Sequence, residues 1–161
     1  MLFAWSSGGV VEQVILHPLA ISRTDVSPNP SPLWVVWGGP VTSVLIPLLI
    51  WRVSHWRDWS LTPVVRFFAG FCLIANGLYL ATAVIDPVGD SAVLLRLGCP
   101  VWVLVLFGVV AVPIGFLLWH GQARHFGYGP EAEPVNRNLT ISLTLFVLLL
   151  IVIESLLSAR L

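Results

Sequence analysis

Four long apolar segments dominate the pattern of hydrophobic and polar positions along the chain. They cover residues 33–51, 64–85, 99–119 and 139–157. Each is close to the roughly 20 residues that an α-helix needs to cross the hydrocarbon core of a bilayer. The pattern therefore predicts an α-helical integral membrane protein with about four transmembrane helices, and we treat residues 1–161 as a single membrane domain.

Residues 9–32, which precede the first span, follow a different pattern. They begin with a stretch rich in β-branched residues and end in the turn-forming run Ser27-Pro28-Asn29-Pro30-Ser31-Pro32. The apolar stretch is too short to cross a bilayer as a helix, and it contains the polar residues Glu12 and His17. Because β-branched residues between turn signals favour strands, we expect a short β-hairpin-like segment at the membrane, followed by a loop.

The composition strengthens the membrane interpretation. Hydrophobic residues make up 57% of the chain and charged residues 10%, whereas soluble domains carry about 25% charged residues. The formal net charge is zero, and no basic patch indicates a nucleic-acid partner. We therefore expect membrane lipid to surround the protein. Cys72 and Cys99 lie in apolar segments and are expected to be free, buried thiols.

The distribution of arginine predicts an orientation. The loops 52–66 and 120–138 hold five of the eight Arg residues, and the opposite side holds three. The positive-inside rule then places these two loops in the cytoplasm. The expected location is the inner (plasma) membrane of a bacterium.

Three polar residues stand out around the second span. Asn76 lies in the middle of the span, so its amide must bond either to another helix or to bound water or a ligand. Asp86 and Asp90 follow the end of the span, where a carboxylate is either a functional group or an interfacial residue that starts a loop. The residues after Asp90 predict a short amphipathic helix that Gly98 ends.

Three features in this order resemble one known family. The strand-like stretch 8–19 is similar to a membrane-associated β-hairpin, and Trp37-Gly38-Gly39-Pro40 is similar to an Ala-Gly-Pro motif that opens a span. Asn76 followed by the stretch 89–96 resembles an Asn…Leu-Asp-Gly-Gly-Arg-Ile-Leu pattern. Together they resemble the site-2 protease type of intramembrane zinc metalloproteases, over roughly residues 5–97.

The resemblance implies roles for individual residues. Asp90 matches the third zinc ligand of the family because a Leu-Leu-Arg helix start follows it. Asp86 is the alternative ligand, since its distance from Asn76 is nearer the usual one. Asn76 is the implied substrate contact, Gly38, Gly39 and Pro40 form the structural motif, and transmembrane proteins are the implied substrates. Apart from the resemblance, His17 before Pro18 is either a ligand or substrate contact or a structural, interfacial histidine.

One departure from the family changes the expected activity. No H-E-x-x-H motif occurs in the sequence, and this motif supplies two zinc-binding His residues and the general base. A catalytic zinc usually takes three protein ligands and a water molecule. Zinc belongs to the complete family member, so we expect this chain alone to bind none and to hydrolyse no peptide. In the family the motif lies on a helix that ends just before the β-segment, here at Met1–Trp5, which favours a missing N-terminal part.

Two further interpretations remain open. The chain could be a non-catalytic pseudoprotease or a membrane partner subunit that binds transmembrane helices. It could also be a small transporter component, in which Asn76, Asp86 and Asp90 line a polar pathway.

Overall fold

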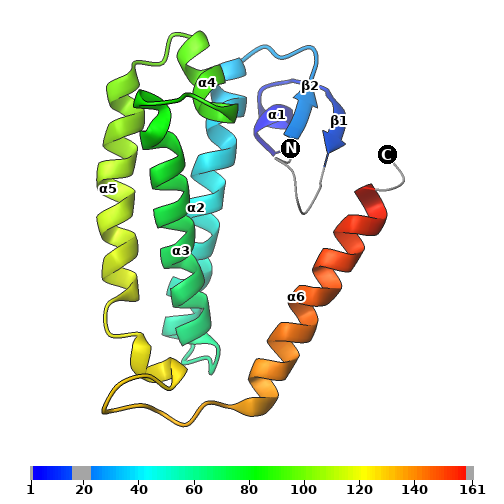
Figure 1. Cartoon of the computed structure of the whole chain (residues 1–161). Helices are drawn as coiled ribbons and strands as arrows, with labels where there is room; N and C mark the ends of the chain where they lie inside the picture. Colours follow the sequence, from blue (N-terminus) through cyan, green and yellow to red (C-terminus); the bar gives the residue numbers. More distant parts are fainter. Residues whose placement is uncertain (1, 16–22, 159–161) are drawn as a thin grey trace. The chain divides into compact units, whose positions relative to one another are not determined.

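The structure, a computed structural model, describes residues 2–15 and 23–158 (Figure 1). Contacts within the chain group its residues into two units. One unit contains residues 1–31 and 134–161, and the other contains residues 32–133.

The first unit begins with a short helix, α1 (Leu2–Ser6), and a two-stranded antiparallel sheet. The strands are β1 (Val11–Ile15) and β2 (Arg23–Val26), and an irregularity in the register falls between Val11 and Gln13. The predicted short β-hairpin-like segment is therefore confirmed. His17 lies outside the described residues.

The same unit contains α6 (Arg137–Ser158). This helix is apolar along nearly its whole length, and none of its residues in the span 137–156 is buried within the chain.

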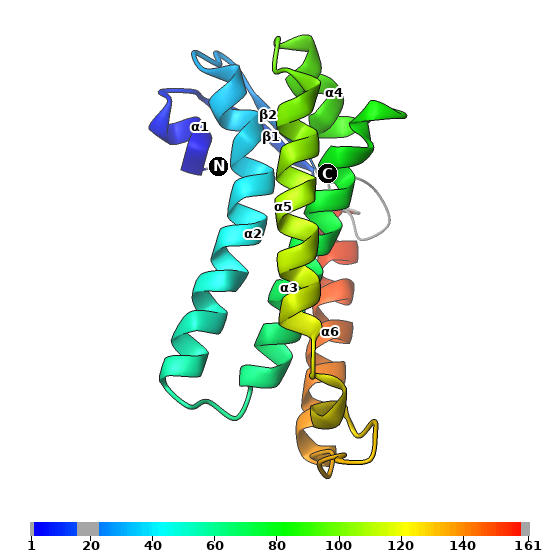
Figure 2. The ribbon, with the colours of Figure 1, turned by 90° about the vertical axis from the view of Figure 1, so that its left-hand side faces the viewer.

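The second unit is built from three long helices that lie side by side (Figures 1 and 2). They are α2 (Pro32–Trp56), α3 (Thr62–Ala81) and α5 (Val101–Trp119), and α3 contacts both of the others. A single turn of 3₁₀ helix, Thr82–Val84, extends α3. The short helix α4 (Gly89–Arg96) packs at the end of the unit where α2 begins.

Four described helices are long and apolar enough to cross a membrane, at the four positions that the hydrophobic pattern predicts. The first is longer than expected, because α2 continues past residue 51 to Trp56. The sequence prediction stopped at the first charged residue, Arg52. A helix can extend beyond the apolar core of a bilayer, because its charged side chains then lie at the interface.

Close packing of α3 against α5 depends on glycine. A Cβ atom at Gly108 would lie 2.6 Å from the carbonyl oxygen of Gly77, and one at Gly115 would lie 2.8 Å from the carbonyl oxygen of Gly70. The two glycines of each helix are seven residues apart, so the same face of each helix repeats the contact after two turns. Small residues of this kind let helix backbones approach closely.

A cluster of buried leucines fixes α4 to the long helices. Leu94 of α4 packs with Leu80 of α3 and Leu104 of α5, and all three side chains are fully buried. Gly98 ends α4 with a φ of +84°, as the sequence predicts, and such a conformation favours glycine. This packing holds the first turn of α4, which contains Asp90, against the ends of α2 and α3.

Candidate functional site

Asp90 lies in the first turn of α4, and its carboxylate is next to α2. A Cβ atom at Gly39 would lie 3.4 Å from Asp90 Oδ2, which is an ordinary van der Waals contact. Gly39 itself is exposed. The absence of a side chain at Gly39 therefore leaves open space beside the carboxylate of Asp90.

Tyr79 of α3 holds the backbone around Asp90. Its hydroxyl accepts a hydrogen bond of 2.8 Å from the backbone N–H of Asp90 and donates one of 3.3 Å to the carbonyl oxygen of Val88. The first N–H groups of a helix have no partner within the helix. The tyrosine thus supplies an acceptor that the first turn of α4 lacks, and it ties this turn to the end of α3.

The carboxylate of Asp90 is partly buried. None of the hydrogen bonds or ion pairs among the described residues includes either of its oxygens. Burial raises the pKa of the Asp90 carboxyl above its ordinary value, because removing water disfavours the charged form. An acid that is desolvated and not paired is a candidate for binding a cation or a substrate group.

Asn76 lies deeper between α2 and α3. Ser43 Oγ of α2 donates a 2.8 Å hydrogen bond to Asn76 Oδ1, and Asn76 Nδ2 donates one of 2.8 Å to the backbone carbonyl of Cys72. The amide therefore links two helices, which is one of the two roles that the sequence left open. Its second N–H is not used by these bonds, and the residue is only partly buried.

We call Asp90, Gly39, Ser43 and Asn76 the α2–α3 seam. Gly39 and Ser43 are four residues apart and therefore lie on one face of α2, about 6 Å apart along the helix axis. Gly39 is next to Asp90, and Ser43 bonds to Asn76. Both predicted residues Asp90 and Asn76 therefore lie beside positions on one face of α2, Asp90 beside Gly39 and Asn76 beside Ser43.

The other predicted residues occupy different places. Asp86 is exposed and lies between α3 and α4. Gly38, Gly39 and Pro40 lie inside α2, which begins at Pro32, as the sequence predicts. Gly38 and Pro40 are buried, whereas Gly39 faces Asp90. Asp90 is thus better placed than Asp86 to act together with the glycine motif.

The described residues do not fit a zinc centre on their own. Among residues 2–15 and 23–158, no three His, Cys, Asp or Glu side chains are close enough to hold one metal ion together. Asp90 is one suitable ligand, and the chain leaves room beside it at Gly39. A zinc ion at Asp90 would need its other ligands from outside the described residues.

Two residues that contact Asp90 and Asn76, Tyr79 and Ser43, were missed by sequence reasoning. Serine is common within apolar spans, and aromatic residues such as Tyr79 are common near the ends of such helices, so neither residue stood out in the sequence. A signal for both was present, because Ser43 follows Gly39 by four residues and Tyr79 follows Asn76 by three. Such spacings place residues on one helix face.

Comparison with protein-family models, with curated proteins and with solved structures gave no match. The resemblance to site-2 proteases therefore depends on the residues of this chain alone.

Proposed function

We propose that the chain is a membrane-embedded protein of the site-2 metalloprotease type, in which Asp90 and the α2–α3 seam face a transmembrane protein substrate. The four long apolar helices support insertion into a membrane. In this proposal Asp90 is a metal ligand and Asn76 contacts the substrate.

The arrangement of Asp90 is the observation that best supports the proposal. Its carboxylate is partly buried and not hydrogen-bonded within the described residues, and it lies beside a glycine of the Gly-Gly-Pro motif. A structural carboxylate at a helix start would ordinarily accept hydrogen bonds from nearby N–H groups. Leaving one desolvated without such a partner is costly, which favours a ligand-binding role.

The proposal does not include peptide hydrolysis by this chain alone. The described residues supply one ligand, and the sequence lacks the H-E-x-x-H pair of histidines and its glutamate. Hydrolysis would need those groups to come from other parts of the native protein or from an associated chain.

Zinc content tests the proposal. The protein would be purified from its own membrane with its associated chains retained, and its zinc would be counted by mass spectrometry. We expect one zinc per chain, lost in Asp90→Ala and retained in Asp86→Ala, which is the matched control. The 161-residue chain expressed alone should contain none.

The same experiment can reject the proposal. Absence of zinc from the native protein, or equal zinc in wild type and Asp90→Ala, would remove Asp90 as a ligand. Gly39→Leu provides a second variant, because its side chain would occupy the space beside Asp90. It should also lower zinc content if the proposal is right.

A non-catalytic partner subunit is the second candidate function. It is favoured by α6, whose span has no residue buried within the chain. It is also favoured by the role of Asn76, whose side-chain oxygen accepts a hydrogen bond from Ser43 and so joins α3 to α2. This function predicts a folded, zinc-free protein that stays associated with another membrane protein.

A further inference from the structure

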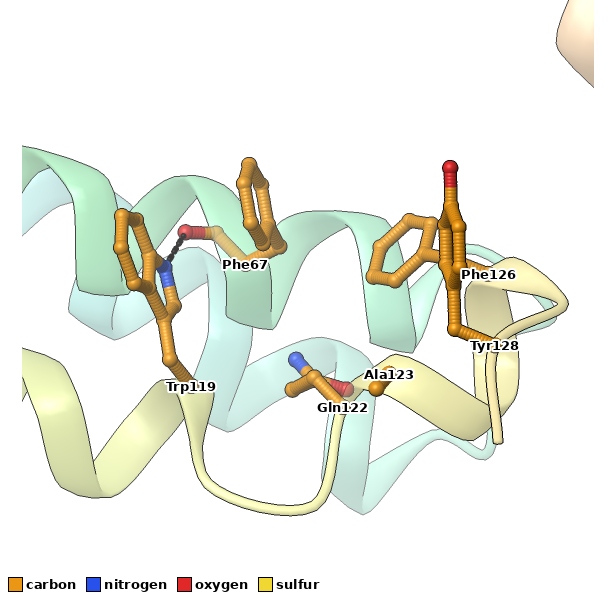
Figure 3. Close-up of a pocket in the computed structure, with 6 residues that line it drawn as sticks. All are labelled: Phe67, Trp119, Gln122, Ala123, Phe126 and Tyr128. Carbon is orange, nitrogen blue, oxygen red and sulfur yellow. Dashed lines mark hydrogen bonds between the residues drawn. The ribbon is translucent and has the colours of Figure 1, made fainter. Parts of the chain in front are cut away.

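An open pocket lies at the end of the second unit that is remote from Asp90. Its volume is about 460 Å³, and it is formed by the start of α3, the end of α5 and the loop that follows α5 (Figure 3). Four of its six lining residues are aromatic. The lining residues are Phe67, Trp119, Gln122, Ala123, Phe126 and Tyr128.

The aromatic walls are held in place by their own contacts. The rings of Phe67 and Trp119 are stacked with centroids 5.0 Å apart, and Phe126 meets Phe67 edge-on at 5.4 Å. Trp119 Nε1 also donates a 2.9 Å hydrogen bond to the carbonyl oxygen of Phe67. These walls are therefore preformed, which lowers the entropy that a ligand loses on binding.

Gln122 supplies a polar group in this apolar pocket. Its side chain lies below Phe67, with Trp119 on one side and Phe126 on the other (Figure 3). The residue is 3% exposed, and its Nε2 donates to the carbonyl oxygen of Pro63 at 3.1 Å. Its Oε1 is buried, and no donor among the described residues bonds to it. A buried acceptor without a donor is destabilising, and a donor that enters the pocket would pair it.

A positive charge lies next to the pocket. Arg66 precedes Phe67, and its guanidinium donates to the carbonyl oxygen of His120, two residues before Gln122, at 3.1 Å. Arg66 Nε is buried and has no acceptor among the described residues. Arg66 therefore flanks the pocket without lining it, and its guanidinium keeps one buried N–H without an acceptor, while Gln122 within the pocket has an unpaired acceptor.

The pocket also lies at the ends of two membrane-length helices. Phe67 is near the start of α3, and Trp119 is the last residue of α5. Aromatic side chains at such ends lie at the level of lipid head groups. A ligand there would combine an apolar chain, a hydrogen-bond donor for Gln122 and an anionic group for Arg66.

We propose that this pocket binds one phospholipid whose head group carries an N–H donor, of the phosphatidylethanolamine class. The acyl chain would lie along the aromatic walls, the ammonium group would donate to Gln122 Oε1, and the phosphate would face Arg66. The inference requires membrane insertion, but it requires neither zinc nor Asp90. A result on this pocket therefore does not depend on the outcome at the α2–α3 seam.

Native mass spectrometry of the detergent-purified full chain tests the proposal, with phosphatidylethanolamine and phosphatidylcholine of identical acyl chains as probes. Phosphatidylcholine has the same phosphate but no N–H. We expect one phosphatidylethanolamine per chain and about a tenfold preference over phosphatidylcholine, because a charge-assisted hydrogen bond distinguishes them. Ala123→Trp should abolish retention by filling the pocket.

Two further variants separate recognition from folding. Gln122→Leu should remove the preference between the two lipids while apolar retention persists. Trp102→Leu, which changes an exposed ring at the other end of α5, should behave as wild type. Equal retention of both lipids by the wild type would overturn the proposal. The proposal would also be overturned if Ala123→Trp still retained phosphatidylethanolamine, or if the wild type carried no bound lipid.

Discussion

The hydroxyl of Tyr79 lies between two backbone groups at the start of α4, and it bonds to the N–H of Asp90 at 2.8 Å. Gly89 lies directly between these groups, with a φ of +53°. A Cβ atom at Gly89 would collide with the Tyr79 hydroxyl. Tyrosine on α3 and glycine at the start of α4 are therefore matched, and together they set where the Asp90 carboxylate points.

Replacing Tyr79 with Phe tests this relationship. The substitution keeps the ring but removes the hydroxyl, so the N–H of Asp90 and the carbonyl of Val88 both lose a partner. We expect unfolding free energy to fall by about 1–2 kcal/mol, measured by thermal or denaturant unfolding in detergent. Tyr128→Phe changes an exposed ring in the same unit and should leave stability unchanged. Equal stability of Tyr79→Phe and wild type would show that the hydroxyl does not hold α4.

The pH dependence of stability should reveal the environment of Asp90 in the zinc-free chain. Because burial raises the pKa of Asp90 in the folded state, the folded state holds this proton more tightly than the unfolded state. Stability should therefore increase as the pH falls from neutral through the raised pKa, and this gain should be complete near the unfolded value of about 4.

Asp90→Asn is the variant that isolates this effect. The amide keeps the shape but carries no charge, so Asn should be more stable than Asp at neutral pH and should lack this component of the pH dependence. Unfolding of both proteins would be followed between pH 4 and pH 7. Asp86→Asn serves as the control, since Asp86 is exposed. Parallel pH profiles for wild type and Asp90→Asn would contradict the assignment.

The sequence predicts the elements of this fold much better than it predicts their pairing. The lengths of the apolar segments locate all four long helices, and the β-branched stretch before them locates the first strand of the hairpin, whereas the second strand, Arg23–Val26, follows that stretch. Hydrophobic length is a local property. It contains no information on which carbonyl of α3 meets which glycine of α5, because that depends on the packing of distant segments.

The candidate site shows the same limit. Asp90 and Asn76 could be singled out because polar groups beside apolar segments are costly and therefore unusual. Their partners Tyr79 and Ser43 could not, since a tyrosine and a serine are common in such helices. The pocket around Gln122 was also missed, because it forms only when the loop after α5 folds back on the start of α3.

A double-mutant cycle tests the link between Ser43 and Asn76. Each residue would be changed to Ala alone and in combination, and unfolding free energies would be compared in detergent. Because Ser43 Oγ donates directly to Asn76 Oδ1, we expect a coupling energy of about 0.5–1.5 kcal/mol. A cycle between Thr42 and Asn76 is the control, since Thr42 bonds to backbone carbonyls of its own helix. Coupling near zero for Ser43 and Asn76 would leave the amide free to bind a ligand.

The glycine contacts between α3 and α5 lead to the largest expected effect. Gly108→Val would place a branched side chain where a Cβ alone comes within 2.6 Å of the Gly77 carbonyl oxygen. The obstacle is backbone rather than a flexible side chain, so the two helices must separate along the whole interface. Overpacking of this kind costs about 1–3 kcal/mol, and we expect Gly115→Val to act similarly through the carbonyl of Gly70.

The neighbouring residue Val109 provides the matched control for this interface. It is 62% exposed on another face of α5, so Val109→Ala should change stability by less than about 0.5 kcal/mol. If Gly108→Val were as stable as Val109→Ala, α3 and α5 would not pack through these glycines.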